Sequence, residues 1–69
     1  MRQEAALEAV REIGPCTTMD VVHRIYGDVP EWKVASLRAN TFYALRCCER
    51  YGEITHTVVN GIAIWRCVP

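Results

Sequence analysis

Apolar residues recur at helical spacing over the first two thirds of the chain and at strand spacing over the last third. In the first segment, one helical face carries the apolar positions Ala6, Leu7, Val10 and Ile13, and the opposite face carries Glu4, Glu8, Arg11 and Glu12. This pattern predicts an amphipathic helix that ends at Gly14-Pro15.

The second segment carries its own start and stop signals. Thr17 and Asp20 have the spacing of a capping box, in which each side chain bonds to the other residue's backbone amide. A second helix is therefore predicted from about Thr18 to Tyr26, with Gly27 ending it at a positive φ angle that costs glycine little.

Residues 28–36 leave two possibilities open, because Pro30 suits either the first turn of a long helix or a turn between helices. We favour a turn or short helical piece. Ser36 would then cap a third helix that runs to about Tyr51 and is closed by Gly52.

The last segment has the pattern of a β-hairpin. Two runs rich in β-branched residues, 54–59 and 62–68, flank Asn60-Gly61, a pair that accepts the positive φ angles of a type I′ turn. In this register Val59 faces Ile62 and His56 faces Trp65, and we expect the face that bears Trp65 to pack on the helices. The pattern predicts a small α+β fold, a three-helix bundle with a C-terminal two-stranded hairpin.

Length and charge narrow the class of protein. A chain of 69 residues supports a single core, so we treat 1–69 as one domain. Its formal net charge is zero, which gives no overall attraction to nucleic acid or to anionic membrane. Because no apolar run has the length of a signal peptide or of a membrane span, we expect a cytoplasmic protein with no membrane role.

The reactive residues favour neither a metal site nor catalysis. The four cysteines include no C-x-x-C pair, and Cys47 and Cys48 are neighbours that point about 100° apart on a helix. We expect Cys48 and Cys67 on inward faces, Cys16 in a turn, and neither histidine as a ligand. No phosphate-binding loop or nucleophile with a base is present, so we expect no enzyme, no cofactor and no small-molecule substrate.

The stretch that joins the third helix to the hairpin carries a resemblance. The pattern Thr41-x-x-x-Leu45-x-x-Cys48-x-x-x-Gly52-x-Ile54, after two shorter helices, resembles the winged helix-turn-helix family, with Thr41 and Cys48 in place of the more usual aliphatic residues. The resemblance covers 5–68 and implies that helix 18–26 positions helix 36–51 in the major groove of DNA. Two departures are the long connection 27–35 and a hairpin tip without Lys or Arg.

Helical projection separates two faces of the third helix. The core side collects Leu37, Thr41, Ala44, Cys48 and Tyr51, with Leu45 at its border. The candidate DNA-contacting residues are Arg38, Asn40, Phe42, Tyr43, Arg46 and Arg50. Arginine can bond guanine or phosphate, asparagine can read adenine, and a tyrosine hydroxyl can donate to phosphate.

Two functions follow as hypotheses. The first is a small transcriptional regulator that binds duplex DNA, as a dimer, because one neutral module makes few phosphate contacts. The alternative is an interaction module that docks a protein partner through Phe42 and Tyr43 without nucleic acid, since adjacent exposed aromatics favour a contact surface.

Overall fold

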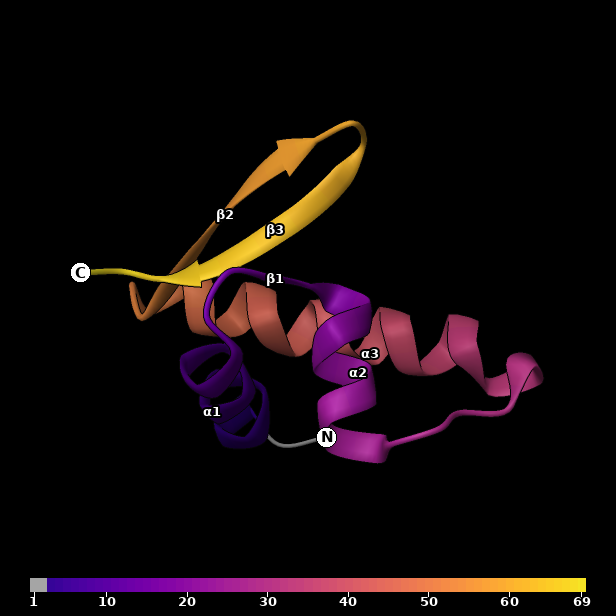
Figure 1. Cartoon of the computed structure of the whole chain (residues 1–69). Coiled ribbons are helices and arrows are strands. Elements are labelled where there is room, and N and C mark those ends of the chain that lie inside the picture. Colours follow the sequence, from indigo (N-terminus) through magenta and orange to yellow (C-terminus); the bar gives the residue numbers. More distant parts are fainter. Residues whose placement is uncertain (1–2) are drawn as a thin grey trace.

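The computed structural model describes residues 3–69 and shows a small α+β protein with three helices and a three-stranded antiparallel sheet (Figure 1). The elements in chain order are α1 (Gln3–Ile13), β1 (Cys16–Thr17), α2 (Thr18–Tyr26), α3 (Glu31–Arg50), β2 (Ile54–Val59) and β3 (Ile62–Cys67). The helices lie together on one side of the sheet, and the turn between β2 and β3 points away from them (Figure 1).

The predicted capping box is present at the start of α2. The Thr17 hydroxyl accepts from the Asp20 amide at 3.1 Å, and the Asp20 carboxylate accepts from the Thr17 amide at 2.9 Å. These bonds satisfy amides that lack partners within the helix. The predicted span Thr18–Tyr26 is confirmed, and Gly27 follows it with a φ of 71°.

The prediction for the start of α3 was wrong. The helix begins at Glu31 with Pro30 as its N-cap, and Ser36 lies inside it. Pro30 has a φ of −57°, which suits a helix start, and its carbonyl accepts from the Lys33 amide at 2.9 Å. The connection between α2 and α3 is therefore residues 27–30, much shorter than the predicted 27–35.

The sheet has one strand more than the hairpin predicted from sequence. Strand β1 pairs antiparallel with β3, placing Cys16 opposite Trp65 and Thr17 opposite Ile64. Cys16 is thus a buried strand residue and the prediction of a turn was wrong. A strand of two residues is too short to show the alternation of apolar and polar residues that predicts a strand. Its pairing satisfies backbone groups of β3 that would be unpaired if β3 were an edge strand.

The hairpin register agrees with the sequence prediction. Val59 pairs with Ile62, and His56 pairs with Trp65 across β2 and β3. At the turn, Asn60 and Gly61 both have positive φ angles, 51° and 77°, as a type I′ turn requires.

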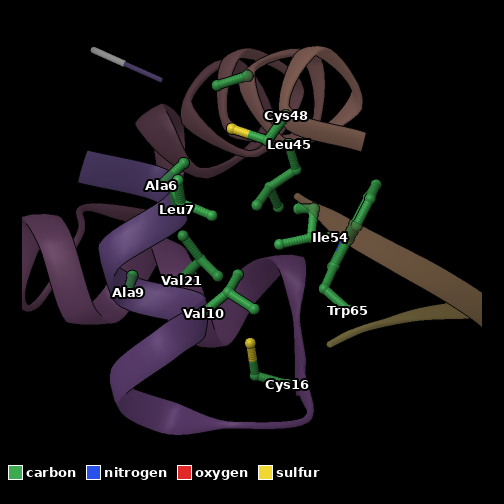
Figure 2. Close-up of a cluster of buried hydrophobic side chains, with 11 residues drawn as sticks. Ala6, Leu7, Ala9, Val10, Cys16, Val21, Leu45, Cys48, Ile54 and Trp65 are labelled. Atoms are coloured by element: carbon green, nitrogen blue, oxygen red, sulfur yellow. The ribbon is translucent and has the colours of Figure 1, made fainter. Parts of the chain in front are cut away.

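One core joins the helices to the base of the sheet. Figure 2 shows Ile54 of β2 pointing toward Leu45 of α3 and Val10 of α1, with Trp65 of β3 beside Ile54. Trp65 is fully buried, as predicted, and its indole N–H donates to the Thr18 hydroxyl at 2.9 Å. This bond satisfies a polar group that would otherwise be costly at the centre of the core.

The predicted faces of α3 are partly corrected. Thr41, Ala44 and Cys48 are buried as expected, and Leu45, expected at the border, is fully buried. Tyr51, expected in the core, is 75% exposed. The helix ends at Arg50, so the projection of about 100° per residue no longer applies to Tyr51, which caps the helix instead.

On the hairpin, the face that bears Trp65 packs on the helices only near its base. Ile54 is buried there, whereas Val58 near the turn is 65% exposed. Cys67, expected to face inward, is exposed at the end of β3. The core therefore reaches the hairpin only around Ile54 and Trp65.

Candidate nucleic-acid interface

Helix α3 carries all six residues predicted from sequence as DNA contacts, and all six are exposed. They lie on two flanks of the helix. Arg38, Phe42 and Arg46 follow one another at steps of four on the flank next to the hairpin, while Asn40 and Tyr43 lie on the flank next to α1. Arg50 belongs to the last turn, between the two flanks.

Charge is unevenly distributed among the helices. Helix α3 contains four Lys and Arg residues against two glutamates, whereas α1 contains one arginine against three glutamates. Among the described residues, Arg38 and Arg50 form no ion pair, and Arg46 lies 3.6 Å from the Glu49 carboxylate. An exposed pair of this kind contributes little to stability, so the Arg46 guanidinium is available for an external contact.

The hairpin flank of α3 is held by aromatic and polar contacts. Phe42 meets Trp65 edge to face with ring centroids 5.6 Å apart, and the His56 ring lies 4.6 Å from Trp65. Nδ1 of His56 is 2.5 Å from the Glu49 carboxylate. These contacts fix β2 against α3, so the helix and the hairpin form one surface.

Phe42 is therefore only partly an outward residue. Its side chain is 38% exposed because one edge packs on Trp65, whereas Tyr43 is 76% exposed. Tyr43 lines a hollow of about 370 Å³ between α1 and α3, together with Gln3, Asn40, Ala44 and Cys47. The two adjacent aromatics thus face different surroundings and do not form one patch.

A larger hollow lies between α3, the hairpin and the first turn of α2. We call it the α3–hairpin groove. Its volume is about 660 Å³, and its lining residues are Thr17, Thr18, Met19, Ala35, Arg38, Ala39, Phe42, Gly61, Ile62 and Ala63. The lining is mostly apolar, and Arg38 is its one charged side chain among the described residues.

Sequence reasoning did not find the groove. The lining residues come mainly from α2, α3 and the hairpin, which are far apart in the chain. One local feature of the sequence does indicate a contact surface. Three apolar residues, Val58, Val59 and Ile62, flank an exposed turn, where polar residues are expected. These three side chains are 53–65% exposed.

The N-terminal half of α3 extends past the rest of the molecule. None of residues 31–40 is buried, and these turns project beyond α2 (Figure 1). Trp32 is 78% exposed there, with Lys33 Nζ 4.9 Å from its ring centroid. A helix end open on most sides can enter a groove in a larger partner.

Two of the four thiols, Cys16 and Cys48, are buried in the core. Burial, with smaller effects of Asp20 and Cys67, raises the pKa of Cys16 to about 11, and burial also raises the pKa of Cys48. Residues 3–69 contain no group of three or more His, Cys, Asp and Glu side chains arranged to hold a metal ion. The cysteines described here are all free.

Comparisons with protein-family models, with curated proteins and with solved structures gave no significant match. Across residues 3–69, no helix has both the length and the apolar character needed to cross a bilayer. The class defined by fold and surface is a small α+β domain with one basic, partly uncovered helix.

Proposed function

We propose that this chain is a winged-helix domain that binds duplex DNA through α3 and acts as a small transcriptional regulator. The observation that carries the proposal is the exposed side of α3, where Arg38, Arg46 and Arg50 lie along a helix whose N-terminal half is uncovered. A helix of this kind fits the major groove, which admits one α-helix.

The connection between α2 and α3 supports the same proposal. Residues 27–30 match the three or four residues that join the helices of a compact helix-turn-helix. The long connection predicted from the sequence, which would have differed from that of the winged helix-turn-helix family, is therefore absent. In this arrangement α2 would position α3, and the hairpin would stand beside it as the wing.

The arginines have separable roles in the proposal. Arg46 and Arg38 lie on the flank next to the hairpin, where guanidinium groups can reach base edges or phosphates, and Arg50 lies at the helix end. The hairpin tip has no Lys or Arg, so the wing adds little electrostatic attraction. One copy would therefore bind weakly, and we propose that two copies act together.

Fluorescence anisotropy with a labelled duplex of mixed sequence, at low salt, tests the proposal. The wild type is expected to bind, with an affinity that falls as salt rises because phosphate contacts release counterions. The double variant Arg46→Glu/Arg50→Glu is expected to lose binding. Arg11→Glu, on the acidic helix α1, is the matched control and is expected to bind like the wild type.

Absence of wild-type binding, or equal binding by the double variant, would overturn DNA binding through α3. Urea unfolding of each variant verifies that it is folded. Exposed charge changes alter stability only slightly, so a folded double variant is expected.

A second candidate function, docking of a protein partner without nucleic acid, is favoured by the apolar lining of the α3–hairpin groove. Phe42 would serve this role and Tyr43 would not, because Tyr43 lies on the other flank of α3. Net charge zero and the uncharged hairpin tip favour the same candidate.

A further inference from the structure

The α3–hairpin groove exposes apolar surface from two elements that face each other. Phe42 of α3 packs one edge on Trp65 and leaves the rest of its ring in the groove, and Ala63 and the 53% exposed Ile62 of β3 also line it. Met19 and Ala39 extend the apolar lining. Exposed apolar residues gathered in a concave site favour a binding role over simple solvation.

The groove also has a charge preference. Arg38 is the only charged residue among its lining side chains, and it forms no ion pair with any residue of 3–69. The start of α2 adds no attraction for an anion, because the Asp20 carboxylate already lies there and accepts from the Thr17 amide. An occupant that carries a carboxylate would complement Arg38.

We propose that the groove docks an amphipathic, acidic helical segment of another protein. The segment would insert a large apolar side chain into the groove beside Phe42 and place a carboxylate against Arg38. Such helix-in-groove recognition uses apolar anchors spaced three or four residues apart. The inference rests on the second candidate function, protein docking, and does not require DNA binding.

A second copy of this chain does not supply such a segment. Helix α1 is its acidic amphipathic helix, but Ala6, Leu7 and Val10 on its apolar face are buried in the core. Presenting that face to a neighbour would require α1 to leave its own fold. The occupant is therefore a different protein.

Selection from a random peptide library displayed on phage, with the wild type as bait, tests this inference. The enriched peptides are expected to share a large apolar residue with Asp or Glu three or four positions away. A fluorescein-labelled enriched peptide is then measured by anisotropy against variants. Ile62→Asp and Arg38→Glu are each expected to weaken binding about tenfold or more, as central contacts of an interface do.

Matched controls separate the groove from general surface effects. Val68→Asp introduces the same charge at another exposed apolar residue of the chain, and Arg11→Glu reverses a charge on α1. Both are expected to bind like the wild type. A peptide with Lys in place of its acidic residue is expected to bind Arg38→Glu better than it binds the wild type.

The inference is overturned if no peptide is enriched, if enriched peptides lack an acidic residue, or if their binding survives Ile62→Asp. It is likewise overturned if the groove binds duplex DNA instead of a peptide. In that case no peptide binds the wild type, and Phe42→Ala weakens the binding of the duplex. Peptide and duplex are measured separately on the wild type, so failure of one proposal is distinguishable from failure of the other.

Discussion

Two threonines in the core have opposite surroundings. Thr18 accepts a hydrogen bond from the Trp65 indole, whereas the hydroxyl of Thr41, also buried, has no partner among the described residues. A buried hydroxyl without a partner has lost its bonds to water and gained none in return. The same residue type thus stabilises the fold at one position and costs free energy at the other.

The change from threonine to valine distinguishes these positions. Thr41→Val is expected to raise the free energy of unfolding by about 1 kcal/mol, because a methyl group replaces an unpaired hydroxyl. Thr18→Val is expected to lower it by about 1–3 kcal/mol, because the Trp65 N–H loses its acceptor. Urea unfolding measures both, and shifts of the same sign would contradict the assignment.

The buried thiol of Cys16 predicts a loss of stability at high pH. Burial raises the pKa of Cys16 from 9.0 to about 11, so between these values the unfolded chain releases a proton that the folded chain retains. The free energy of unfolding is expected to fall as the pH rises from about 9 to about 11. Urea unfolding across this range should show a smaller fall in Cys16→Ala, and an unchanged fall would contradict it.

At the scale of elements, the sequence predicted what local signals encode. The capping box fixed the start of α2, and Asn60-Gly61 fixed the register of β2 and β3. The start of α3 could not be decided, because Pro30 is compatible with a turn and with a helix start. Strand β1 could not be predicted, because its two residues form a strand only by pairing with β3.

The projecting half of α3 predicts uneven protection along one helix. None of residues 31–36 is buried. In the C-terminal half of the helix, by contrast, Thr41, Ala44, Leu45 and Cys48 are buried. Amide hydrogen exchange is expected to be fast in 31–36 and slow in 44–48, since local opening is cheapest where few apolar contacts are lost.

Native-state exchange measured by NMR checks this expectation. Uniform protection along α3 would contradict a free helix end and would indicate that a second copy covers it in solution. Dilution of the sample provides the control, because protection by a second copy falls with concentration.

At the scale of the molecule, the net charge is zero but the positive and negative charges are concentrated on different helices. The cations of α3 and the carboxylates of α1 cancel in the total but lie on different helices. Helical projection placed Asn40 near the border of the core and the other five candidate residues on the solvent side, and all six are exposed. It could not show that Phe42 packs on Trp65 or that Phe42 and Ile62 line the same groove, because those residues are distant in the chain.

We propose that duplex DNA binds the exposed side of α3. Amide chemical-shift mapping tests it most directly: the isotope-labelled protein is titrated with a short duplex of mixed sequence at low salt. We predict that the largest shifts fall on residues 38–50, with few on the outer face of α1. An absence of shifts, or shifts centred on α1, would rule out DNA binding through α3.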